Sequence, residues 1–104
     1  ASGEYGNHGK SQNYRAVLYN AGAGTEKDDL VALYWFDRAA DNGVLEAQKD
    51  RDGILNAYLN NNPAEVFAEI IDQLVKECSN GSKEIPCDEK KAEYWCKRKE
   101  QMLI

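Results

Sequence analysis

The sequence has little of what catalysis requires. It contains one histidine, His8, in a glycine-rich segment where no partner residue is evident, so a Ser–His or Cys–His nucleophile has little support. No P-loop, GxGxxG, CxxC or HExxH motif is present. Asp50 and Asp52 stand in a polar stretch, QKDRDG, at helical spacing, which we interpret as a solvated helix face rather than a Ca²⁺ site. We therefore expect a protein that is not an enzyme and needs no metal or cofactor.

The sequence also lacks long apolar runs and an excess of basic residues. No stretch approaches eighteen consecutive apolar residues, so we expect no segment that inserts into a membrane. Lys and Arg number 13 against 18 Asp and Glu, which gives a formal net charge of −5. Nucleic acids and anionic membranes are bound by clustered Lys and Arg. The charge therefore argues against both and favours a basic or mixed protein surface as partner.

A chain of 104 residues is expected to fold as one domain with one modest core. Residues 1–10 contain three glycines and no hydrophobic periodicity, so we interpret them as a flexible N-terminal tail. Residues 11–104 would then form a single helical domain. The chain begins Ala-Ser-Gly without an initiator Met, which fits a mature chain after signal-peptide cleavage or a remnant of expression.

Hydrophobic periodicity predicts five helices, over residues 11–21, 29–42, 44–60, 63–78 and 88–102. Asp28 or Asp29 is expected to cap the second helix, while Gly22 and Gly43 end the first and second. The first helix has four apolar residues at i, i+3, i+4 and i+7, which predicts a buried face made of Tyr14, Val17, Leu18 and Ala21.

Residues 32–43, ALYWFDRAADNG, and the turn before them resemble one unit of a Sel1-like repeat, a variant of the tetratricopeptide helical hairpins. The matching positions are Tyr19, Gly22, Gly24, Lys27, Asp28, Ala32, Trp35, Ala39, Ala40, Gly43, Ala47 and Gln48. A fainter copy follows sixty residues later, where residues 87–95 repeat the pattern of residues 27–35. Self-similarity at a fixed offset is typical of repeat proteins. We expect an all-α fold, a short α-solenoid of about five helices.

The aromatic residues of the two copies are expected to differ in exposure. Trp35 and Trp95 occupy the core position of the family that the chain resembles, so the resemblance implies that both are buried. Tyr34 and Tyr94 precede them by one residue and are expected to turn partly outward.

The resemblance implies a protein-binding module, because stacked helical hairpins present an extended concave surface to partners. Sel1-like proteins are known as scaffolds and adaptors in bacterial envelopes, secretion and signalling. The family therefore implies another protein as the partner and a periplasmic or secreted location, with the cytoplasm as the alternative. Residues that line the binding surface are expected mainly from the first helix of each hairpin: Tyr14, Arg15, Tyr19, Asp50, Asn56 and Tyr58.

Three other interpretations stay open. A small acidic exported domain could be an immunity or inhibitor protein that neutralises a secreted toxin. Some cysteine-rich Sel1-like proteins have been proposed to bind or hydrolyse peptidoglycan-like and β-lactam ligands, so the resemblance also allows a cell-wall hydrolase or β-lactam-binding protein. The apolar end of the sequence, Met-Leu-Ile, fits a fragment of a longer repeat array, since natural arrays end in polar caps.

The three cysteines fall in the last 27 residues. Cys78 ends the fourth predicted helix and Cys87 precedes the fifth, so these two would face each other across an antiparallel hairpin. We predict a Cys78–Cys87 disulfide, with Cys96 reduced and buried, which would imply an oxidising compartment. The alternative is three reduced thiols in a cytosolic protein.

Overall fold

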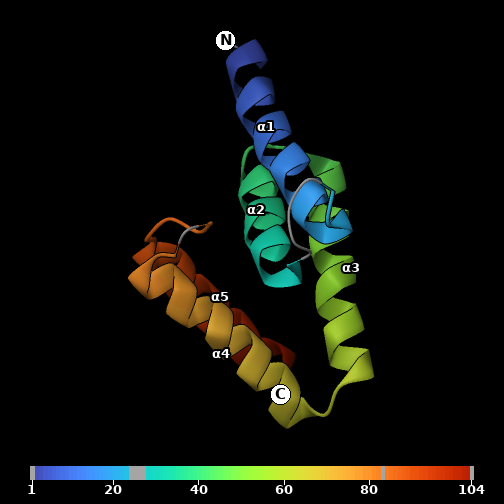
Figure 1. Ribbon diagram of the computed structural model, residues 1–104, viewed down its shortest axis with the longest axis vertical. Coiled ribbons are helices and arrows are strands. Elements are labelled where there is room, and N and C mark those ends of the chain that lie inside the picture. Colours follow the sequence, from blue (N-terminus) through green and yellow to red (C-terminus); the bar gives the residue numbers. More distant parts are fainter. Residues whose placement is uncertain (1, 24–27, 83, 104) are drawn as a thin grey trace. The chain divides into compact units, whose positions relative to one another are not determined.

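The computed structural model describes residues 2–23, 28–82 and 84–103, with side chains from residue 9 onward. These residues form five helices and no strand (Figure 1), which confirms the all-α prediction. The helices are α1 (Ser2–Ala21), α2 (Asp29–Asp41), α3 (Leu45–Asn61), α4 (Ala64–Asn80) and α5 (Glu89–Met102). Their pairing into hairpins is compatible with a short solenoid-like repeat. Gly24 and Lys27, two positions of the family resemblance, lie outside the described residues.

The chain divides into two compact units, Ala1–Ala57 and Tyr58–Ile104, where the sequence predicted a single domain over residues 11–104. In the first unit α1 packs against α2, and in the second α4 packs against α5 (Figure 1). The boundary falls within α3. Each hairpin carries its own tryptophan, Trp35 or Trp95, and its own set of buried residues. Each unit therefore has buried residues of its own.

The first unit is built around α2, in which all of residues 31–37 are buried. Asp28 caps this helix, as predicted: its Oδ1 accepts hydrogen bonds from the backbone N–H groups of Leu30 at 3.1 Å and Val31 at 3.2 Å. Gly43 has a φ of 90° just beyond the end of the helix. That conformation favours glycine and lets the chain turn at once into α3.

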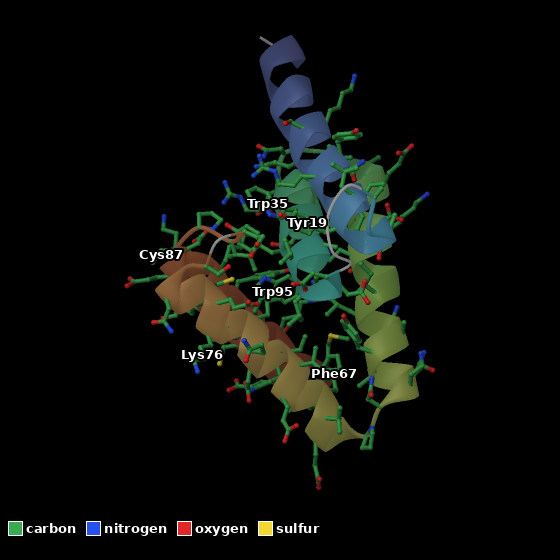
Figure 2. All side chains as sticks on the ribbon, in the orientation of Figure 1. Tyr19, Trp35, Phe67, Lys76, Cys87 and Trp95 are labelled. Atoms are coloured by element: carbon green, nitrogen blue, oxygen red, sulfur yellow. The ribbon has the colours of Figure 1, made fainter. Side chains whose placement is uncertain are left out.

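The second unit has one continuous apolar stripe on α4, which consists of Phe67, Ile71, Leu74 and Cys78. On α5, Asp88 caps the first turn and Ala92 and Trp95 are buried. Figure 2 shows Phe67 near the start of α4 and Cys87 at the opposite end of the hairpin. The connecting loop is closed by a hydrogen bond from the Asp88 N–H to the Cys78 carbonyl at 2.7 Å. This hydrogen bond holds the end of α4 and the start of α5 together.

An ion pair links the two helices of the second unit: Lys99 Nζ on α5 lies 2.5 Å from Asp72 Oδ1 on α4. The hydrogen bond to Asp72 raises the pKa of the Lys99 ammonium above its ordinary value. A raised lysine pKa means that the stabilisation is complete at neutral pH and is lost as the pH rises through the folded-state pKa. The pair therefore supports the hairpin at neutral pH, and deprotonation of Lys99 in alkali removes that support.

The two units repeat one hydrogen bond in the same geometry. Arg38 Nη1 donates to the hydroxyl of Tyr34 at 2.9 Å in α2, and Arg98 Nη1 donates to the hydroxyl of Tyr94 at 2.9 Å in α5. Both pairs have i, i+4 spacing, which places the two side chains on one helix face. The self-similarity at an offset of sixty therefore corresponds to the same local structure.

The aromatic rings repeat as well. The Tyr34 and Trp35 centroids lie 5.1 Å apart at 88°, and those of Tyr94 and Trp95 lie 5.1 Å apart at 78°. Both tryptophans are buried, as predicted, with exposed fractions of 7% and 0%. The prediction that Tyr34 turns outward was wrong, since its side chain is fully buried. Its hydroxyl is satisfied by Arg38, so burial leaves no unpaired phenol.

α1 begins at Ser2, whereas the sequence analysis placed a flexible tail over residues 1–10. Gly9 accounts for the difference. It is buried, and a Cβ atom at this position would lie 2.7 Å from Val44 Cγ2 and 3.3 Å from Asn42 Cβ. Beside it, Asn42 Nδ2 donates to Gln12 Oε1 at 2.7 Å. The glycine thus allows α1 to approach the turn between α2 and α3 closely instead of ending the helix.

This role of Gly9 can be tested by comparison with Gly53, which lies in α3 with no atom within 4 Å of a Cβ at that position. We expect Gly53→Ala to raise the free energy of unfolding by about 0.5–1 kcal/mol, the usual helix gain. Gly9→Ala should lower it by about 1 kcal/mol, because overpacking exceeds that gain. Urea unfolding measures both. An equal gain from Gly9→Ala would contradict the close approach, and adding Val44→Ala should relieve the clash.

Candidate functional site

The apolar residues of α1 lie on its outward side. Tyr14 and Val17 are 66% and 42% exposed, and Ala21 is exposed too. The prediction that this face is buried was therefore wrong; Leu18 alone of the predicted set is half-buried. The reason is steric: α1 turns small residues, Gly9 and Ala16, inward, where they allow close approach. The large apolar side chains of α1 consequently point away from α2.

The two other predicted binding residues of α1 take part in the hairpin itself. The Arg15 guanidinium lies 4.5 Å from the centre of the Trp35 ring, a cation–π contact between α1 and α2. Tyr19 is half-buried, and its carbonyl accepts the N–H of Asp28 at 3.0 Å, which closes the turn between the helices. Figure 2 shows Tyr19 on α1 and Trp35 on α2 within this unit. Of the three, Tyr14 is the residue most accessible to a partner.

The predicted binding residues of α3 do not form one surface. Asp50 and Asn56 are both exposed, but six residues of α-helix separate their directions by about 120° around the axis. Tyr58 is half-buried and belongs to the second unit. Asp50 and Asn56 therefore do not share one face of α3.

A pocket of about 460 Å³ lies between α1 and the start of α3, and sequence reasoning missed it. Its lining residues are Lys10, Asn13, Asn42, Gly43, Val44, Leu45 and Glu46. Leu45, at 72% exposure, is an apolar side chain left almost uncovered at its edge. Lys10 and Asn13 share the outward face of α1 with Tyr14 and Val17 because the four follow i, i+3, i+4, i+7 spacing.

We call this region the α1 surface. It is defined by four residues on α1 and three at the α2–α3 turn: Lys10, Asn13, Tyr14, Val17, Val44, Leu45 and Glu46. Tyr14, Val17 and Leu45 are three of the four large hydrophobic side chains that the described residues leave exposed. Of the three, Leu45 lines the pocket, and Tyr14 and Val17 follow Lys10 and Asn13 along α1; exposed apolar side chains beside a pocket with polar lining residues are typical of a binding surface.

A buried ion pair positions the α3 side of this surface. Arg51 Nη1 lies 2.9 Å from Asp37 Oδ1, and the two side chains are only 10% and 1% exposed. Arg51 Nε also lies 3.1 Å from Asp52 Oδ1. The sequence analysis interpreted the stretch QKDRDG as a solvated face, but Arg51 turns inward because α2 offers a buried carboxylate. The pair fixes α3 against α2, so it also fixes where α3 begins.

The three cysteines form no disulfide in the structure, where the sequence analysis predicted a Cys78–Cys87 bridge. Their side chains differ in burial. Cys78 is buried within the apolar stripe of α4, and Cys87 is exposed, with its thiol donating to the carbonyl of Ser79 at 3.2 Å. Cys96 is half-buried. The hydrogen bond between the Asp88 N–H and the Cys78 carbonyl brings the backbone beside Cys87 close to Cys78, but the two sulfur atoms are not bonded.

Within the parts of the chain that the structure describes, no group of three His, Cys, Asp or Glu side chains is arranged to hold a metal ion. A search of the same residues finds no helix with the length and hydropathy needed to cross a membrane. The sequence matches no protein-family model, no curated protein and no solved structure. The likeness to Sel1-like repeats therefore rests on the residues quoted above and stays a prediction.

We expect Arg51→Ala and Asp37→Ala each to lower the free energy of unfolding by about 3–5 kcal/mol, because each removes one partner of a buried ion pair. The double variant should lose less than the sum of the two, since neither charge then remains. Urea unfolding of the four proteins gives this coupling. Lys49→Ala, on the exposed side of α3, is the matched control and should stay within about 0.5 kcal/mol. Additive losses would show that the two side chains do not depend on each other.

The thiols should react with Ellman's reagent in the order of their exposure: Cys87 first, Cys96 more slowly, and Cys78 only after unfolding. Cys87→Ser should remove the fast phase and leave the other two unchanged. If only one of the three thiols reacts after complete unfolding, the protein instead contains the Cys78–Cys87 bridge that the sequence predicts.

Proposed function

We propose that this chain is a protein-interaction module, not an enzyme, and that it binds a partner protein on the α1 surface. The observation that carries the proposal is the outward orientation of the apolar residues of α1. Helices of water-exposed hairpins ordinarily turn such a stripe toward the core. Here Tyr14 and Val17 are 66% and 42% exposed, and Leu45, on the pocket beside Lys10 and Asn13 of the same helix, is 72% exposed.

The energetics favour a partner of moderate affinity. Complete burial of a large apolar side chain is worth about 1.5–3 kcal/mol, so covering Tyr14 and Leu45 would provide a useful part of a binding free energy. Tyrosine is common among the residues that dominate interfaces, because it offers a large rigid contact area and a polar end. The polar rim, which includes Lys10 and Glu46, would set the orientation of the partner.

The resemblance to Sel1-like repeats supports a bacterial envelope or secretion-related protein as the setting, with a periplasmic or secreted location and the cytoplasm as runner-up. The net charge of −5 favours a basic or mixed partner surface over nucleic acid. A secreted toxin as the bound partner would make the chain an immunity or inhibitor protein.

The test is affinity capture from the native host with wild-type protein and with the variant Tyr14→Ser/Val17→Ser, followed by mass spectrometry. Both positions are exposed, so we expect the variant to keep its melting temperature within a few degrees. It should lose the captured protein almost completely. Gln73→Ser, exposed on α4 of the other unit, is the matched control and should retain it. A stoichiometric partner that the double variant still captures would overturn the proposal.

A further inference from the structure

The α1 surface carries opposite charges on its two sides. Lys10 lies on the α1 wall of the pocket and Glu46 on the α3 wall. Within the described part of the chain, neither side chain forms an ion pair. The exposed apolar residues Tyr14, Val17 and Leu45 accompany them. The surface thus has an apolar part, a cation on one side and an anion on the other.

Such a surface is complementary to itself. A two-fold rotation about an axis through the pocket exchanges the two walls, so that Lys10 of one molecule meets Glu46 of the other, twice in each dimer. The exposed Leu45, which lines the same pocket, lies within the surface that this contact would cover. From this charge arrangement we propose that a second copy of this chain binds the α1 surface and forms a symmetric dimer.

The inference rests on the proposed function in one respect, that the α1 surface binds protein. The inference then says what binds this surface when no other partner is present, namely a second copy of the chain. The apolar patch is small and the charged pairs stand at its rim, where ion pairs contribute little affinity and mainly define orientation. We expect a dissociation constant on the order of micromolar or weaker, as for transient interfaces. A heterologous partner on the same surface would compete with the second copy.

Charge exchange tests the dimer directly. Lys10→Glu places two carboxylates opposite each other at each contact, and Glu46→Lys places two ammonium groups there. Each variant alone should therefore dimerise about tenfold or more weakly than wild type. An equimolar mixture of the two variants should form a heterodimer through one contact between the two unchanged side chains and one between the two substituted ones, since both are then attractive. The chain with both substitutions should recover self-association. Sedimentation velocity from about 10 µM to about 1 mM measures all four cases.

Lys49→Glu is the matched control, because Lys49 is exposed on α3 but does not line the pocket. It should dimerise as wild type does, and thermal melting should show that every variant is folded. A wild-type chain that stays monomeric at about 1 mM, or a mixture that associates no better than its components, would overturn the proposal. The capture experiment with the Tyr14/Val17 variant is independent of this result. A monomeric chain that captures a partner through α1 would refute the dimer and keep the proposed function.

Discussion

The contact between Asp37 and Arg51 is the constraint on which the first unit depends. A buried ion pair is not a strong source of net stability, because desolvation offsets most of the attraction. Its effect is to fix a single arrangement: Arg51 must meet Asp37, so α3 has one register against α2, and Leu45 and Glu46 are held at the edge of the pocket. Sixty residues after Asp37 the chain has Lys97, an exposed residue paired with Glu93. The second unit therefore has no counterpart of this constraint at the equivalent position.

The two hairpins share their second helix and differ in their first. α2 and α5 carry the same aspartate cap, the same Tyr–Trp contact and the same Arg–Tyr hydrogen bond. α4 supplies large apolar side chains such as Phe67 and Leu74 to its hairpin, whereas α1 supplies Gly9 and Ala16. Among the described residues, the second hairpin thus exposes one large apolar side chain, Val66 at 37%, whereas the first helix of the first hairpin leaves Tyr14 and Val17 exposed at 66% and 42%. The two hairpins therefore differ in their first helices, α1 and α4, and the first hairpin leaves more of its large apolar side chains exposed.

The sequence was sufficient for the helices, the Asp28 cap and the burial of both tryptophans, because these follow from local periodicity, cap chemistry and a repeated pattern. It was insufficient for the orientation of α1. Periodicity groups Tyr14 with Val17 but does not say whether their face turns inward, and tertiary contacts decided that. Gly9 looked like a feature of a tail because its role is a close approach to residues more than thirty positions away. Arg51 looked solvated for the same reason, since its partner lies on another helix.

The exposed apolar residues of α1 also link the stability of this helix to the binding of a partner. Among the described residues, the contacts of α1 with α2 and the turn after it include the close approach at Gly9, the Asn42–Gln12 hydrogen bond and the Arg15–Trp35 cation–π contact. This packing leaves the side chains of Tyr14 and Val17 66% and 42% exposed. Anything that binds the folded form and covers those groups stabilises it by mass action. Binding at the α1 surface and the folding of α1 are therefore linked equilibria, so a partner that covers Tyr14 and Val17 would stabilise the helix.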